Sequence, residues 1–323
     1  MAMGLGGVQA DLAAVSVLSV NGNVIGVSRM LEAKLRDIGY DFDFADARKA
    51  GAALAAVAPE VLVVGVPFPF STHVELLHYW RDATVLSDVA IEVRTVPPPL
   101  MSQALESGEI DAFCVGEPWG SVAVDAGNGA LLLPGKAIWA FAPEKVLSVR
   151  SQWADTEPHL LGRLMRATWK AGRWLSQPQS WTAAAALLAR KEYLNVSAEL
   201  IDRALSGHLT ISHTGEQRRI DGFVEFHQGA ANFPWRSQAK WFGARLADRI
   251  GLDATLATAS AGAVFRSDIY REALKGAGAD LPGASEKLEG AIQDPTAVAS
   301  QRGRLILSPD AFFDGRIYDL TAR

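Results

Sequence analysis

The sequence predicts an α/β fold in which helices cover a parallel or mixed sheet. Strand-like and helical segments alternate along the first third of the chain, as expected for such a sheet. Two of the strands, Val61–Val66 and Ile110–Val115, open into polar turns of the kind that hold a ligand at the carboxyl edge of a sheet. At 323 residues, 49% of them hydrophobic and 21% charged, the chain can build a real core and has room for two lobes.

The first predicted elements lie on either side of an NGN turn at residues 21–23. An apolar run before the turn predicts a strand, and apolar residues after it predict a helix. An alanine-rich stretch predicts the next helix, and a β-branched run predicts the buried strand that follows it. In chain order these elements are strand 14–19, helix 24–35, helix 47–57 and strand 61–66.

The next helix, 72–81, begins beside two candidate N-cap residues, Ser71 and Thr72. A run of prolines ends strand 91–96, and either Pro98 or Pro99 suits the first turn of the helix after it. Strand 110–115 follows. The pattern changes beyond residue 158, where long helical stretches predict a helical region; the tail contains a further helix at 267–274.

Two tryptophans in the helical region, Trp169 and Trp174, are expected in its core. Cys114 lies in an alternating apolar stretch and is expected to be a small buried residue rather than a nucleophile, which would need a nearby base. The segment 227–242 mixes aromatic and basic residues, and we interpret it as packing a lobe or docking a partner.

Composition excludes several classes of function. A net charge of −5 and a pI near 5.7 argue against direct nucleic-acid binding. A single cysteine excludes an intramolecular disulfide, and the sequence shows neither a signal-peptide n-region nor a long apolar span, so a soluble cytoplasmic protein is expected. Because the common nucleotide, hydrolase and metal motifs are missing, no cofactor and no metal site are predicted.

Several polar residues beside the predicted turns are candidate ligand groups. Thr72 and His73 stand where a helix begins, and such a terminus suits an anion; the alternative is a capping segment with a surface histidine. Gly116 either offers its backbone to a ligand or simply allows a tight turn. Lys145 either neutralises an anion or is a solvated lysine, and Asn23 either supplies an amide or tolerates positive φ in its turn.

Four separated segments resemble the nitrate-binding receptors of the nitrate/bicarbonate ABC transporter family: STHVELLHYW, VPPPLMSQALESGEIDAFCVGEPWGSVAV, APEKVLSV and ANFPWRSQAKW. The resemblance implies a two-lobed type II periplasmic-binding-protein fold. It places residues 1–48 and 140–323 in lobe one with the C-terminal helical region, and residues 49–139 in lobe two. It also implies that lobe one is incomplete at the N-terminus, because the family's opening strand, helix and strand would precede Met1.

By this resemblance, His73 and Lys145 match anion-contacting side chains, Gly116 matches a glycine whose backbone approaches the anion, and Asn23 and Thr72 complete the expected set. The implied function is binding of nitrate or nitrite, signalled by lobe closure. SVNGNVIGVSR, FPFSTH and FRSDIYREAL resemble the cytoplasmic sensor that partners an ANTAR-type antiterminator.

Two other functions stay open. The chain could be the substrate-binding subunit of a nitrate or bicarbonate importer that works with an ABC permease, and would then be periplasmic if a signal peptide is encoded upstream. It could also be an enzyme like those of pyrimidine biosynthesis, which would depend on Cys114 or His73.

Overall fold

The computed structural model describes residues 9–319, and the chain folds into two compact units. The first unit contains the chain up to Val20 together with Phe141–Gln177 and Glu225–Arg323; the second contains Asn21–Ala140 and Pro178–Val224. This division differs from the predicted lobe boundary at residue 48. Residues 21–48 belong to the second unit because the strand that follows the NGN turn hydrogen-bonds within that unit's sheet.

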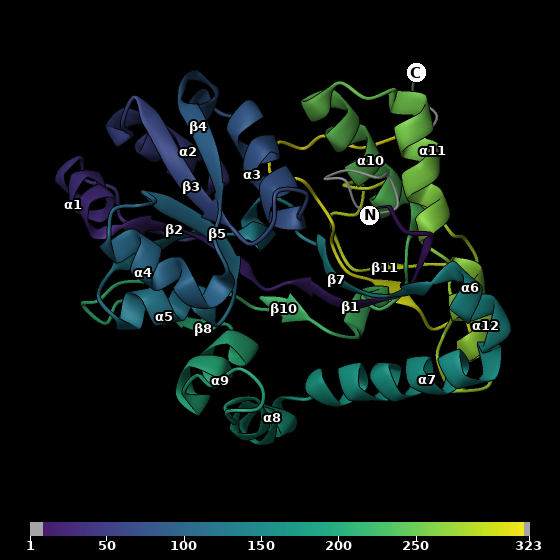
Figure 1. The fold of residues 1–323 in the computed structure, drawn as a ribbon. Helices are drawn as coiled ribbons and strands as arrows, with labels where there is room; N and C mark the ends of the chain where they lie inside the picture. Colours follow the sequence, from purple (N-terminus) through teal and green to yellow (C-terminus); the bar gives the residue numbers. More distant parts are fainter. Residues whose placement is uncertain (1–8, 320–323) are drawn as a thin grey trace. The chain divides into compact units, whose positions relative to one another are not determined.

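The second unit is built on a five-stranded sheet in the order β4-β3-β5-β2-β6 (Figure 1). β3 is parallel to β4 and β5, whereas β2 is antiparallel to both β5 and β6. Every residue of β2 and β6 is buried, so both faces of this part of the sheet are covered. The strands are β2 (Asn23–Ser28), β3 (Val61–Val66), β4 (Ala90–Thr95), β5 (Ala112–Gly116) and β6 (Gly129–Pro134).

Helices and a small hairpin complete the second unit. α4 packs on α5, and α2 is joined to α3 by a hydrogen bond of 2.7 Å from Trp80 Nε1 to the Ala47 carbonyl. The helices are α1 (Arg29–Asp37), α2 (Ala47–Val57), α3 (Thr72–Asp82), α4 (Met101–Glu106), α5 (Trp119–Asp125), α8 (Trp181–Leu188) and α9 (Ala198–Ser206); the hairpin pairs β8 (His208–Thr210) with β9 (Gln217–Arg219).

The helix predicted at 24–35 is wrong in its first half. Residues Asn23–Ser28 form β2, and the helix begins only at Arg29. Three β-branched residues in this segment favour a strand, and the strand is held between β5 and β6. Ser28 then caps α1, because its hydroxyl accepts a hydrogen bond of 3.4 Å from the Leu31 amide.

The first unit contains a three-stranded sheet, β10-β1-β7, and a helical layer. β1 includes the predicted strand 14–19, and α12 has the bounds predicted for the last helix. The strands are β1 (Leu12–Asn21), β7 (Pro143–Arg150), β10 (Val224–Glu225), β11 (Thr296–Ala297) and β12 (Ile306–Leu307); the helices are α6 (Ser151–Thr156), α7 (Pro158–Leu175), α10 (Arg236–Ile250), α11 (Ala254–Val264) and α12 (Ser267–Leu274).

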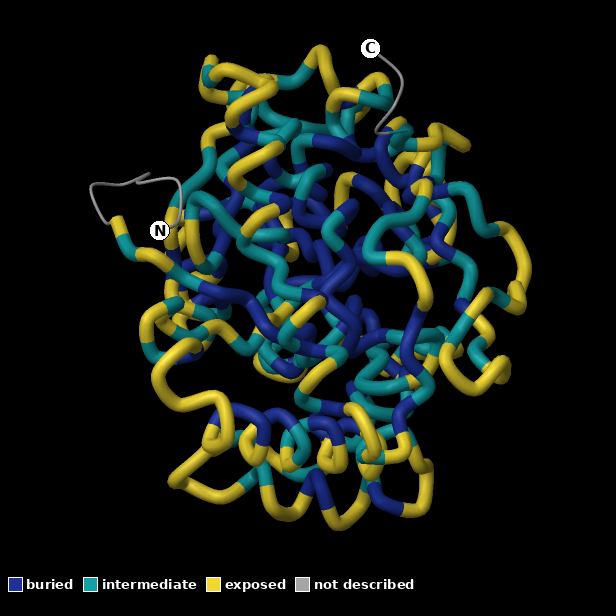
Figure 2. The backbone as a smooth tube through the Cα atoms, turned by 90° about the vertical axis from the view of Figure 1, so that its right-hand side faces the viewer, coloured by how far each residue is buried: buried dark blue, intermediate teal, exposed yellow. Residues whose placement is uncertain are grey.

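The helix α7 buries one face in the core of the first unit. Leu161, Met165 and Trp169 recur at a spacing of four residues and pack in one apolar cluster. Trp174 falls on another face and is 40% exposed, so its predicted place in the core is wrong. Figure 2 shows exposed residues gathered in loops and outer helical turns, while long buried stretches run through the interior.

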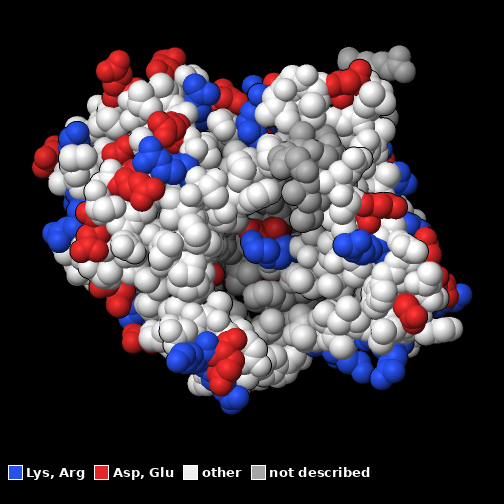
Figure 3. All heavy atoms as spheres, viewed as in Figure 1, with Lys and Arg blue, Asp and Glu red and all other residues white. Residues whose placement is uncertain are grey.

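The surface carries both signs of charge. On the face drawn in Figure 3, acidic and basic side chains are interspersed, and no broad basic patch covers it. Between residues 9 and 319 no helix combines the length and the apolar character that a membrane crossing requires.

Candidate functional site

One edge of the second unit's sheet gathers the ends of four strands and the start of the fifth. β3, β4 and β5 are parallel, and β6 runs with them because β5 and β6 are both antiparallel to β2. β2 therefore begins at the edge where the others end, and its first residue, Asn23, pairs with Gly116 at the end of β5. Ligands of open α/β sheets bind at this carboxyl edge.

The Asn23 side chain is the most unusual group at this edge. Asn23 is fully buried, and neither its Oδ1 nor its Nδ2 makes a hydrogen bond within residues 9–319. Burying an amide with no hydrogen bond costs about 1–3 kcal/mol, so such a group calls for a partner. Gly135, just after β6, makes room for it: a Cβ built on Gly135 would lie 1.9 Å from Asn23 Oδ1.

His73 lies beside Gly116. It is the second residue of α3 and is only 2% exposed, so the alternative of a surface histidine is wrong. A Cβ built on Gly116 would lie 4.0 Å from His73 Nε2, which places the imidazole beside the glycine backbone. Glycine thus leaves the space between the ring and the strand end open.

The start of α3 adds a favourable electrostatic environment for an anion. Thr72 is the first residue of this helix, where the partial positive charge of the helix dipole is concentrated. Ser71 is the N-cap residue by its backbone angles, yet its hydroxyl donates to the Phe68 carbonyl at 2.7 Å. The Ser71 side chain is thus turned back to the preceding loop.

Glu117 follows Gly116 and brings an acid close to the site. Its amide donates to the Gly22 carbonyl at 2.9 Å, and its Oε2 accepts a hydrogen bond of 3.1 Å from the Ser121 amide. The other oxygen, Oε1, is buried and meets no hydrogen-bond partner in the described part of the chain. Burial raises the pKa of Glu117 to about 7, against the opposing effect of the hydrogen bond from the Ser121 amide.

The structure thus places four of the five predicted site residues, Asn23, Thr72, His73 and Gly116, at one edge of one unit. Lys145 lies on β7 in the first unit, where its side chain is 63% exposed and forms an ion pair with Glu144. Its predicted contact with the same ligand stays a prediction. Cys114 is buried inside β5, as expected of a small apolar residue.

Sequence reasoning missed the roles of Gly135 and Glu117. Gly135 lies 112 positions beyond Asn23, and only the pairing of β2 with β6 brings the two together. Glu117 lies in the polar turn after the predicted strand 110–115, but the pKa of its carboxyl depends on burial that a sequence does not display. Among residues 9–319, no three His, Cys, Asp or Glu side chains are grouped as metal ligands would be.

Known relatives of the chain are named as binding proteins for nitrate, nitrite or bicarbonate, or as an ATP-binding protein of nitrate import. It is 29% identical over 268 residues to the nitrate/nitrite binding protein NrtA of Synechococcus elongatus, covering 79% of this chain and 57% of that protein. It is 28% identical over 295 residues to the bicarbonate-binding protein CmpA of Synechococcus, covering 84% and 62%. It is also 30% identical to the nitrate import ATP-binding protein NrtC of Synechocystis, covering 76% and 36%.

The chain spans about half the length of the NrtA relatives that it matches, 57% of one and 50% of another. In three dimensions it resembles the periplasmic nitrate-binding protein NrtA of Synechocystis, with a TM-score of 0.77 and 23% identity over 95% of this chain and 74% of that one. The ligand-binding component of an ABC-type import system of Staphylococcus aureus follows, with a TM-score of 0.58, 15% identity and coverages of 82% and 75%.

These likenesses confirm the predicted two-lobed fold of periplasmic binding proteins and the resemblance to the nitrate and bicarbonate receptors. The family assignment rests on a separate match. The model of the NMT1-like family matches residues 1–189, which is more than half of the 323 residues. The chain belongs to the NMT1-like family.

Proposed function

We propose that the chain binds nitrate or nitrite at the sheet edge formed by Asn23, Gly116 and the start of α3. The observation that carries the proposal is the buried Asn23 amide, whose donor and acceptor atoms find no partner between residues 9 and 319. A planar, singly charged oxyanion needs a few convergent donors and little positive charge. An amide N–H, a glycine backbone and a helix N-terminus supply that set.

The role that we propose is solute binding for an ABC importer, outside the cytoplasm. Support comes from the relatives, which are named as binding proteins or as ATP-binding proteins of nitrate and bicarbonate transport. The structural neighbour NrtA is named as periplasmic. Ligand binding would shift an equilibrium between arrangements of the two lobes, and a permease would respond to the change. The cytoplasmic sensor that partners an ANTAR-type antiterminator stays a prediction.

We propose binding without chemical conversion of the ligand. The relatives carry the names of binding and transport proteins, which supports this view against an enzyme of the pyrimidine-biosynthesis type. Bicarbonate is the alternative ligand, because the relative CmpA is named as a bicarbonate-binding protein. Bicarbonate has an O–H donor as well as acceptor oxygens, whereas nitrate only accepts, so the Asn23 Nδ2 donor matters for both and the Oδ1 acceptor matters for bicarbonate.

Isothermal titration calorimetry tests the proposal with nitrate, nitrite, bicarbonate and sulfate. We expect nitrate and nitrite to bind. Asn23→Ala should weaken the binding of nitrate by at least about 10-fold, because a hydrogen bond to a charged ligand is lost. His73→Ala is expected to weaken nitrate binding by a similar factor. The predicted contact of Lys145 with the ligand implies the same for Lys145→Ala.

Two exposed residues give matched controls: His208→Ala for the histidine and Lys170→Ala for the lysine. Neither lies at the sheet edge, so both should bind nitrate as the unaltered chain does. The proposal would be wrong if nitrate and nitrite gave no heat, or if Asn23→Ala bound nitrate as tightly as the unaltered chain.

A further inference from the structure

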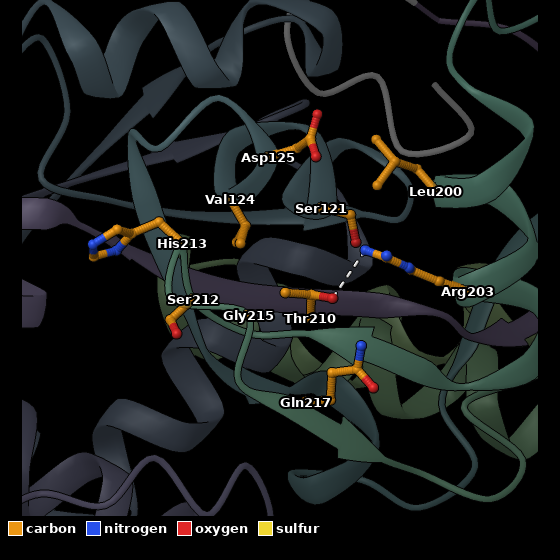
Figure 4. Close-up of a pocket in the computed structure, with 10 residues that line it drawn as sticks. All are labelled: Ser121, Val124, Asp125, Leu200, Arg203, Thr210, Ser212, His213, Gly215 and Gln217. Atoms are coloured by element: carbon orange, nitrogen blue, oxygen red, sulfur yellow. Dashed lines mark hydrogen bonds between the residues drawn. The ribbon is translucent and has the colours of Figure 1, made fainter.

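A polar cavity lies in the same unit as the sheet edge. It has a volume of ≈ 270 Å³ and lies between α5, α9 and the β8–β9 hairpin (Figure 4). Its polar lining includes Ser121, Arg203, Thr210 and Gln217, and its apolar lining includes Val124 and Leu200. One water occupies about 30 Å³ of liquid, so the cavity holds far more than a nitrate ion.

Arg203 provides the positive charge of this cavity. It extends from α9, and its guanidinium donates to Thr210 Oγ1 at 2.9 Å and to Glu199 at 2.5 Å. A guanidinium has five N–H donors, so these two bonds leave donors for a ligand. Glu199 is 71% exposed, and an ion pair this exposed contributes little, so a ligand carboxylate competes with it readily.

Ser121 adds a hydroxyl from α5. Ser121 is 3% exposed, and its Oγ has no hydrogen-bond partner within residues 9–319. The side chain also lies near the Glu117 carboxyl and lowers its pKa. Figure 4 shows the hydroxyl turned toward the Arg203 guanidinium. The two groups therefore face the same part of the cavity from different helices.

The charges around the cavity limit the class of ligand. Arg203 attracts an anionic group, whereas Asp125, exposed at the rim, disfavours an anion of charge −2 or more. Val124 and Leu200 are both buried and offer apolar contact to a hydrocarbon body. Inorganic oxyanions have no such body and are too small for the space.

We propose that this cavity binds a small organic carboxylate of charge −1, with the carboxylate on Arg203 and Ser121 and the hydrocarbon part against Val124 and Leu200. The side chains proposed to hold the carboxylate differ from those of the sheet-edge site, so this proposal does not depend on nitrate binding. An arginine and a hydroxyl converging on one point are suited to the two oxygens of a carboxylate.

The test is a calorimetric titration of the full chain with propionate, using propionamide and inorganic phosphate as comparison ligands. We expect propionate to bind with a Kd of about 1 mM or tighter, and propionamide, which has the same shape without the charge, to bind at least about 10-fold more weakly. Phosphate should not bind at this cavity, because it lacks an apolar part and carries more charge.

Variants locate the binding. Arg203→Gln should weaken propionate binding by at least about 10-fold, and Ser121→Ala should weaken it by about 3-fold. The control is Arg219→Gln, which should not change propionate binding because the Arg219 side chain is 67% exposed and lies outside the cavity. Thermal melting confirms that each variant is folded, and Arg203→Lys keeps the charge if Arg203→Gln does not fold. The proposal would be overturned if propionate showed no saturable binding or if propionamide bound equally well. It would also be overturned if Ser121→Ala and the folded Arg203 variant both bound propionate as the unaltered chain does.

A nitrate titration on the same variants separates this proposal from the sheet-edge site. We expect Arg203→Gln to bind nitrate like the unaltered chain while losing propionate. Asn23→Ala should lose nitrate binding and keep propionate binding. That result would show that the nitrate site and the propionate site are different.

Discussion

At the scale of single residues, the Asn23 amide owes its place to a glycine. A Cβ at position 135 would lie 1.9 Å from Asn23 Oδ1, closer than any real contact, so residue 135 controls where the amide points. The sheet edge therefore depends on residues that never touch a ligand as well as on those that do.

Gly135→Ala should displace the Asn23 side chain and weaken nitrate binding by at least about 10-fold, at a cost in stability of about 1–3 kcal/mol from overpacking. Calorimetry and urea unfolding measure the two effects. The matched control is Gly283→Ala in the first unit, where the new Cβ would meet its nearest atom at 3.4 Å, an ordinary contact. Unchanged nitrate binding in Gly135→Ala would contradict the assigned role of Asn23.

Glu117 makes the stability of the chain depend on pH. Its pKa is about 7 in the folded chain and 4.5 as its ordinary value, so the folded state holds the proton more tightly than the unfolded state. The effect of this group on the free energy of unfolding is therefore most favourable below pH 4.5. The free energy of unfolding falls as the pH rises from 4.5 to 7, and above pH 7 it is lower by up to roughly 3 kcal/mol.

Glu117→Gln removes this titration while keeping the shape of the side chain. Urea unfolding between pH 5 and pH 8 should show the variant gaining stability relative to the unaltered chain as the pH rises. If the two chains kept a constant difference over that range, the buried acid would not have the pKa assigned to it.

At the scale of elements, most helices and strands could be predicted from the sequence, because the spacing of apolar residues over a long segment indicates a helix or a strand. It failed at residues 24–28, where the Val24–Val27 run suits a helix by its apolar spacing but a strand by its β-branched residues. Pairing with β5 and β6 decides between the two, and the paired residues are 85 to 110 positions away along the chain, from Val27 with Ala112 to Val24 with Pro134.

The candidate site shows the same division. Residues next to turns, such as His73 and Gly116, could be found from the sequence, since a turn after a strand marks the edge of a sheet. The burial of Asn23 and its dependence on Gly135 could not, because they follow from the order of strands in the sheet.

The two tryptophans of α7 test the assignment of its buried face. Trp169 is 6% exposed and packs in the core cluster, whereas Trp174 is 40% exposed. Trp169→Ala should cost about 3–5 kcal/mol of unfolding free energy, and Trp174→Ala no more than about 1 kcal/mol. Chemical denaturation of the matched pair measures both, and equal losses would mean that the helix presents another face to the core.

At the scale of the whole molecule, the chain passes between its two units at four points, after Val20, Ala140, Gln177 and Val224. The second unit contains both the sheet edge and the cavity between α5, α9 and the β8–β9 hairpin. Relatives that match this chain include both a nitrate/nitrite binding protein and part of a nitrate import ATP-binding protein, so a similar sequence occurs in proteins of two kinds.

A crystal structure of the chain grown with nitrate tests the central claim most directly. The account predicts a planar, three-oxygen ion at the sheet edge, with one oxygen accepting from Asn23 Nδ2 and another within reach of the Gly116 backbone and the His73 ring. A nitrate ion bound elsewhere, with the Asn23 amide still lacking a partner, would contradict it.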